Sequence, residues 1–86
     1  MNGVDKMKQY NLVFLRSNKV LLSKKKYKDW KEIQDEYIDY MASIEFDTLN
    51  EIEEYIRIDY KLVGEHALRE VSKIKESETD TVELHI

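Results

Sequence analysis

The stretch that decides the fold is DEYIDYMASIEFDTLNEIEEYI, residues 35–56, because its first half fits two structures. At helical spacing the apolar positions are Tyr37, Met41 and Ile44. At strand spacing the alternating positions are Ile38, Tyr40, Ala42, Ile44 and Phe46. A helix continuing through this stretch would pair like charges at i,i+4, as in Asp35 with Asp39, at a cost of about 0.2–0.5 kcal/mol per pair. We therefore predict a strand over 37–46, with one continuous helix as the alternative.

A short helix is predicted just before this strand, over residues 27–36. Its apolar stripe recurs at three and four residues and consists of Tyr27, Trp30, Ile33 and Tyr37.

The second half of the stretch predicts a helix over residues 48–63. TLNE is a capping box, in which Thr48 and Glu51 satisfy each other's backbone amides. The apolar stripe that follows is Leu49, Ile52, Ile56, Tyr60 and Val63. Gly64 supplies a residue of the type that ends many helices.

The flanking segments complete the expected elements. QYNLVFLR and VLLS, separated by SNK, predict a β-hairpin across residues 9–23. Residues 66–75 fit a short helix or a bulged strand, and we favour the helix slightly. TVELHI alternates and predicts a strand at residues 81–86.

Together these elements predict an α+β fold, a small antiparallel sheet of three or four short strands with both helices on one face. Its 86 residues are enough for one modest core, and without cysteine that core must hold by packing alone. Residues 1–8 are expected to be a flexible tail and residues 9–86 a single domain. The expected core joins the helix stripe Leu49, Ile52, Ile56, Tyr60 and Val63 to Tyr10, Leu12, Phe14, Ile44 and Phe46.

Charge is sorted along the chain. Residues 1–31 carry nine Lys or Arg against two acids, and residues 32–60 carry ten acids against Arg57 alone. The remaining residues carry four bases and six acids, so the net charge of −4 hides blocks of +7, −9 and −2. Such a distribution favours an electrically distinct patch that docks a charged partner.

The sequence offers little to an enzyme. It has no cysteine, no G-x-S-x-G motif and no glycine-rich phosphate loop. His66 and His85 lack a metal-ligand spacing, so we expect surface histidines and neither metal nor cofactor. The longest apolar run is about four residues, Leu12 to Leu15, so we expect no membrane span and a cytoplasmic location.

Two charged surfaces are candidates for binding. The first is acidic and rich in tyrosine, and its predicted partner-binding residues are Asp35, Glu36, Asp39, Tyr40, Glu45, Asp47, Glu51, Glu54, Tyr55 and Asp59. The second lies within the basic segment Lys19–Lys31, and its predicted nucleic-acid-binding residues are Lys24, Lys25, Lys26, Tyr27, Lys28 and Lys31.

The prediction is a small non-enzymatic protein-binding module. Its acidic face imitates a phosphate backbone and engages a basic groove of a nucleic-acid-handling protein. The composition is common among phage and mobile-element proteins and favours an inhibitor. The alternatives are a nucleic-acid-binding accessory protein that uses the basic segment and a homodimer held by basic-to-acidic contacts.

Overall fold

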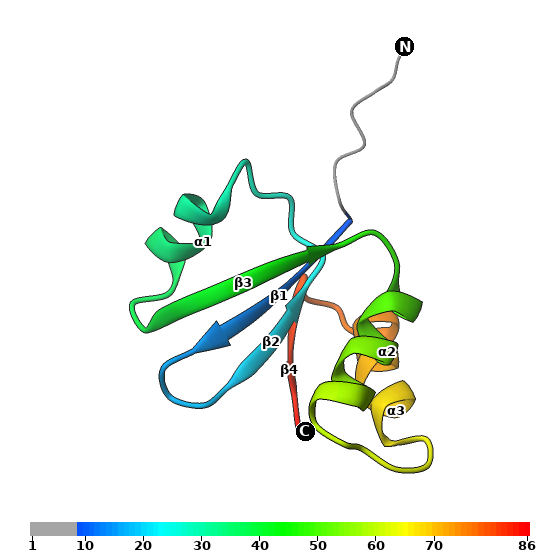
Figure 1. The fold of residues 1–86 in the computed structure, drawn as a ribbon. Helices are drawn as coiled ribbons and strands as arrows, with labels where there is room; N and C mark the ends of the chain where they lie inside the picture. The colour runs from blue at the N-terminus through cyan, green and yellow to red at the C-terminus, as the bar shows by residue number, and fades with distance from the viewer. Residues whose placement is uncertain (1–8) are drawn as a thin grey trace.

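The computed structural model describes residues 9–86, which form a four-stranded antiparallel sheet and three helices (Figure 1). The elements in chain order are β1 Tyr10–Leu15, β2 Val20–Ser23, α1 Trp30–Glu36, β3 Tyr40–Phe46, α2 Leu49–Asp59, α3 His66–Glu76 and β4 Thr81–Leu84. The strand order is β3-β1-β2-β4, with every neighbouring pair antiparallel. The predicted α+β class is confirmed, and the tail predicted over residues 1–8 lies outside the described residues.

The hairpin between β1 and β2 turns at Asn18. The amide of Asn18 donates to the carbonyl of Leu15 at 3.0 Å, and the amide of Leu15 donates to the carbonyl of Lys19 at 3.0 Å. Asn18 has a φ of 70°, the left-handed region that asparagine tolerates better than most residues. The SNK turn predicted from the sequence therefore sets the β1–β2 register, which pairs Phe14 with Val20.

The ambiguous stretch is a strand. Along β3, Ile44 pairs with Leu12 and Phe46 pairs with Tyr10. The strand begins three residues later than predicted, because Tyr37 ends α1 in extended backbone and the Tyr40 amide closes a turn onto the Tyr37 carbonyl at 3.1 Å. The continuous helix is therefore ruled out.

The short helix begins at Trp30, not at residue 27. Asp29 is its N-cap, and the Asp29 carboxylate accepts a hydrogen bond from the Lys31 amide at 3.0 Å. Residues 27–29 are irregular, and Tyr27 is buried beneath the helix rather than carried on it.

Both faces of the sheet are buried, which corrects the prediction that both helices lie on one face. Helices α2 and α3 cover one face, and α1 lies on the other (Figure 1). Leu12 and Val13 are neighbours on β1 and point to opposite faces, and each is completely buried. Since β1 and β2 carry apolar side chains at both parities, a single helical layer would leave half of them in water.

The larger core lies under α2 and α3 and differs in part from the predicted one. Its buried members are Leu12, Val20, Leu22, Ile52, Ile56, Ala67, Val71, Ile74 and Leu84. Helix α3, left undecided by the sequence, supplies three of these residues. The predicted core residues Ile44, Tyr60 and Val63 are instead exposed to 36, 38 and 82%.

Helix α2 starts as predicted and ends early. Both hydrogen bonds of the Thr48–Glu51 capping box are present. The helix stops at Asp59 because Lys61 adopts a φ of 54°, and the Leu62 amide then reaches back to the carbonyl of Arg57 at 3.0 Å. This is a Schellman ending, so Lys61 takes the role predicted for Gly64, and Val63 lies beyond the helix.

The first prediction concerns the buried stripe of α2. Ile56 is completely buried, so Ile56→Asp places an unpaired carboxylate in the core and costs several kcal/mol, out of a total stability of about 5–15 kcal/mol. We expect this variant to lose its cooperative thermal transition in circular dichroism. Ile58→Asp is the control, since Ile58 on the same helix is 61% exposed and the change should cost about 0.5 kcal/mol or less. Equal melting curves for the two variants would reject the core assignment.

The second prediction concerns the helix ending. Lys61 is strained at positive φ, so Lys61→Gly should stabilise the protein by about 0.5–1 kcal/mol and raise Tm by about 2–8 °C. Gly64→Ala should lower Tm, because Gly64 has a φ of 62° while no atom within 4 Å would clash with the new methyl group. A Tm that falls on Lys61→Gly contradicts the left-handed helix ending.

Candidate partner-binding surface

Strand β3 forms one edge of the sheet, and its outer side has no strand neighbour among residues 9–86. Met41 is 58% exposed and Ile44 is 36% exposed, while Glu45 is the one charged residue of the strand. Edge strands in soluble proteins are commonly short, charged or covered, because unpaired backbone groups recruit other chains. A seven-residue edge strand with a single charge is therefore open to pairing with a partner.

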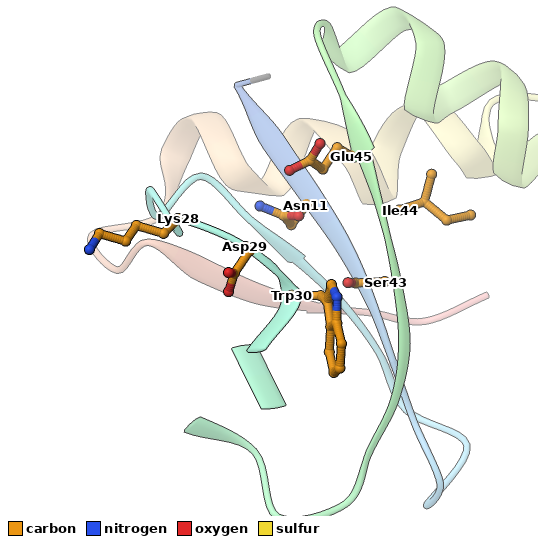
Figure 2. A pocket seen from close by; sticks show the side chains of 7 residues that line it. All are labelled: Asn11, Lys28, Asp29, Trp30, Ser43, Ile44 and Glu45. Carbon is orange, nitrogen blue, oxygen red and sulfur yellow. The ribbon is translucent and has the colours of Figure 1, made fainter. Parts of the chain in front are cut away.

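A hollow of about 570 Å³ lies beside this edge, between β3, β1 and the start of α1 (Figure 2). The side chains that surround it are Asn11, Lys28, Asp29, Trp30, Ser43 and Glu45. Ile44 also borders the hollow, but its side chain points away from the other six in Figure 2. That direction agrees with its pairing opposite Leu12, which faces α2 and α3.

Trp30 forms an aromatic wall of the hollow. Its side chain is 52% exposed, and its ring stacks on Tyr40 with centroids 6.5 Å apart and an interplanar angle of 21°. The ammonium group of Lys31 lies 6.0 Å from the centre of the Trp30 ring, within the range of a cation–π contact. The first residue of α1 thus presents a flat ring to solvent, although the helical stripe read from the sequence placed it with the buried positions.

Asn11 lies at the buried end of the hollow and has an unsatisfied side chain. The residue is 6% exposed, and its amide group has no hydrogen-bond partner among the described residues 9–86. The nearby Ser43 hydroxyl is already bonded to the Tyr40 hydroxyl at 2.9 Å. Leaving a buried polar group without a partner costs about 1–3 kcal/mol, so the Asn11 amide is a group that a ligand could satisfy.

The predicted acidic residues are divided by the sheet. Asp35, Glu36 and Asp39 accompany α1 on one side, and Glu51, Glu54, Tyr55 and Asp59 belong to α2 on the other. Tyr40 and Glu45 lie on β3 between the two groups, and Asp47 precedes α2. The residues therefore flank the free edge on both sides and do not form one continuous band.

Several of these acids serve the fold. Glu51 belongs to the α2 capping box, and Asp39 accepts a hydrogen bond from the Ser17 hydroxyl at 2.8 Å. By contrast, Asp35, Glu45 and Glu54 form no hydrogen bond or ion pair with other residues of the described part of the chain. These three carboxylates are available to a partner.

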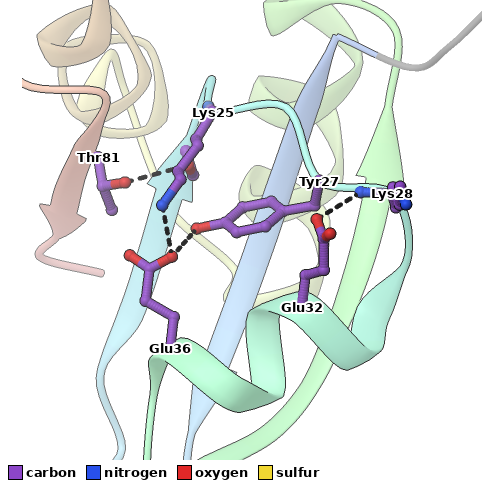
Figure 3. Close-up of polar contacts among 7 residues, drawn as sticks. Lys25, Tyr27, Lys28, Glu32, Glu36 and Thr81 are labelled. Atoms are coloured by element: carbon purple, nitrogen blue, oxygen red, sulfur yellow. Dashed lines mark hydrogen bonds and ion pairs between the residues drawn. The ribbon is translucent and has the colours of Figure 1, made fainter.

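Glu36, the last residue of α1, is held in a partly exposed cluster with Lys25 and Tyr27 of the segment that follows β2 (Figure 3). Its carboxylate accepts from the Lys25 ammonium at 2.9 Å and from the Tyr27 hydroxyl at 2.8 Å. The hydrogen bond from Lys25 outweighs the desolvation of the carboxylate and, with that from Tyr27, holds the pKa of Glu36 below its ordinary value. Burial, followed by the bond to Glu36, raises the pKa of the Tyr27 phenol.

The basic residues keep mostly apart from the acidic segment. Lys25–Glu36 is the one ion pair that joins the two segments within residues 9–86. Lys26 instead contacts Gln9 at 3.1 Å. Tyr27 is only 7% exposed, so its ring is not available to stack on a base. One ion pair therefore joins the two segments, and the basic segment lacks the Tyr27 platform.

Hydrogen bonds of the two histidines connect the C-terminal residues to α3. The ring Nε2 of His66 lies 2.7 Å from the carbonyl oxygen of His85, to which it can donate, and the His85 amide donates to Glu70 at 2.8 Å. Within residues 9–86 no group of three or more His, Cys, Asp or Glu is placed to hold a metal ion.

The third prediction concerns the pH dependence of the Glu36 cluster. Because its folded pKa lies below the unfolded value of about 4.3, Glu36 stabilises the fold above that value, and this contribution is lost as pH falls through the folded pKa. Glu36→Gln should cost about 0.5–1 kcal/mol at pH 7, after allowing for solvent screening of a side chain that is 35% exposed.

Urea denaturation across pH 7 to 3 measures this effect. The stability difference between wild type and Glu36→Gln should shrink as pH falls. Asp35→Asn, the neighbouring carboxylate without a contact among residues 9–86, should track wild type throughout. A Glu36→Gln deficit that is independent of pH would contradict the electrostatic origin of the contribution.

Comparison with protein-family models, with curated proteins and with solved structures returned no match. In the part of the chain that the structure describes, no helix is long and apolar enough to cross a membrane.

Proposed function

We propose that this protein is a small non-enzymatic protein-binding module that docks its partner on the free edge of β3. The β3 surface consists of that edge with the side chains of Met41, Ile44 and Glu45 and the neighbouring ring of Trp30. The observation that carries the proposal is a seven-residue edge strand, exposed and almost uncharged, in a chain of which 37% of all residues are charged. Backbone pairing supplies affinity in such complexes, and the flanking side chains supply specificity.

The carboxylates on either side of the edge indicate the charge of the partner. Asp35 on α1, Glu45 on β3 and Glu54 on α2 have no partner within residues 9–86, and Glu45 lies on the β3 surface itself. A basic partner would be steered towards this side of the molecule, with association that slows as salt is added. A basic groove of a nucleic-acid-handling protein has the complementary charge, and occupying it would make this protein an inhibitor.

Nucleic acid fits the same features less well. Of the two rings in the basic segment, Tyr27 is buried, and Trp30 lines the same hollow as the Glu45 carboxylate. A phosphate near Trp30 would meet Glu45 as well as Lys28 and Lys31, so the carboxylate offsets part of the electrostatic attraction that dominates nucleic-acid affinity.

The fourth prediction tests the β3 surface with exposed substitutions that leave the core intact. Met41→Asp and Glu45→Lys should each abolish capture of basic proteins from a bacterial lysate, because the first adds a charge at the pairing edge and the second reverses the local charge. Glu78→Lys, near the opposite edge of the sheet, is the matched charge-reversal control and should capture the same proteins as wild type.

The same proteins should be titrated with short DNA and RNA at about 50 and 200 mM salt. Little binding is expected from wild type. Tight binding with a steep salt dependence, lost in the double variant Lys25→Glu/Lys26→Glu, would contradict the protein-partner proposal and assign the function to the basic segment.

A further inference from the structure

We infer that the hollow beside β3 receives the guanidinium group of an arginine, carried by an extended segment of the partner that pairs with the β3 edge. The inference rests on the proposed function and names the chemistry that the surface selects. Four features of the hollow carry it: its place beside the edge, its aromatic wall, its unsatisfied polar groups and its charge.

The place of the hollow matches the geometry of an added strand. Ser43 and Glu45 of β3 point towards the hollow, and Trp30 closes it from α1 (Figure 2). Successive side chains of a strand point to opposite faces of the sheet, so every second side chain of a segment paired with β3 lies on the α1 face. One of these side chains passes over the hollow.

The aromatic wall suits a planar cation. The Trp30 ring is half-exposed and is fixed by stacking on Tyr40, so it offers a flat surface whose orientation is already set. Guanidinium groups stack on such rings, and tryptophan binds cations best among aromatic side chains. The ammonium group of Lys31 already lies 6.0 Å from the ring centre, so the ring attracts a cation within this chain, and the flexible Lys31 can yield to another.

The polar groups supply acceptors for a fork of N–H donors. The Glu45 carboxylate has no ion pair or hydrogen bond within residues 9–86, and both of its oxygens can accept from a guanidinium group. The side-chain carbonyl of Asn11, 94% buried and without a partner in the same part of the chain, offers a further acceptor at the depth of the hollow. The guanidinium group of arginine has five N–H donors, enough to donate hydrogen bonds to both residues at once.

The Glu45 carboxylate favours a cation in the hollow. Asp29 and Glu45 line the hollow with Lys28, and the Lys31 ammonium group lies over the Trp30 ring. Glu45 is the carboxylate that has no partner of its own within residues 9–86. One Asp29 oxygen accepts the Lys31 amide and fixes that carboxylate in place at the helix start. A lysine of the partner would neutralise the Glu45 carboxylate, but it could neither stack flat on the Trp30 ring nor form a bidentate pair of hydrogen bonds with Glu45.

The experiment is selection of binders from a random heptapeptide display library on the wild-type protein. Recovered peptides should share one arginine within an alternating apolar pattern. A recovered peptide is then titrated by calorimetry in three forms, with arginine, with citrulline and with lysine at the shared position. Citrulline keeps the planar shape without the charge, so its peptide should bind at least about tenfold more weakly, and the lysine peptide should lie between the two.

Protein variants locate the arginine and report the sign of the ligand's charge. Glu45→Gln and Trp30→Ala should each weaken the arginine peptide by about tenfold, and Trp30→Phe should recover part of the loss. Lys28→Gln should leave binding equal or tighter, because it removes a like charge. Thermal melts confirm that each variant is folded, as expected for substitutions at exposed positions.

The outcomes separate this inference from the proposed function. No recovered peptide, or equal affinity for arginine and citrulline, would overturn the arginine site. Peptides whose binding depends on Met41 but not on Trp30 or Glu45 would overturn the site and leave the β3 edge as the docking surface. Binding of short DNA or RNA that weakens in Lys28→Gln would overturn both.

Discussion

Burial of β1 on both of its faces determines how the helices are arranged around the sheet. Leu12 and Val13 are consecutive, point in opposite directions, and are both inaccessible to water. At about 1.5–3 kcal/mol for each large apolar side chain buried, neither face can be left open in a domain of this size. The chain therefore has to place helices on both sides of one small sheet, with β1 and β2 at its centre.

That requirement accounts for the open edge. Helices α2 and α3 together cover one face of the sheet. Helix α1 is only seven residues long, and on the other face it packs over Val13, Leu15 and Leu21. Strand β3 follows α1 directly and joins the sheet at its edge, beyond the area that α1 covers. The hollow between Trp30 and Glu45 therefore stays open on the α1 face. On the opposite face, α2 and α3 leave Met41 and Ile44 at the edge partly exposed. The surface proposed to bind a partner is thus a consequence of how the core is covered.

Much of the fold could be predicted from the sequence because its signals are local. The SNK turn and the Thr48–Glu51 capping box are short motifs with one structural meaning, and β3 was identified from alternation and like-charge repulsion. The placement of α1 could not be read in this way. Apolar residues at both odd and even positions of β1 indicate that both faces of the sheet are buried. No local sequence pattern shows which helix covers which face. The end of α2 was missed because a lysine at positive φ leaves no sequence signature.

The candidate site was predictable only in part. Charge sorting named Glu45 among the candidate carboxylates, but it could not reveal that Glu36 is held by Lys25 and Tyr27. Trp30 was assigned to a buried stripe, whereas its position as the first residue of α1 leaves it half-exposed. Asn11 gave one signal, a polar residue inside the apolar run YNLVFL, and its meaning depends on tertiary packing.

Amide hydrogen exchange measured by NMR on the isolated protein tests most directly whether the doubly covered centre leaves β3 with a free edge. Amides in the middle of β1 and β2 should exchange only through global unfolding, while every second amide of Met41–Glu45, pointing away from β1, should exchange orders of magnitude faster. Uniform slow exchange along Met41–Glu45 would show that the outer edge is already paired and would contradict a free β3 edge.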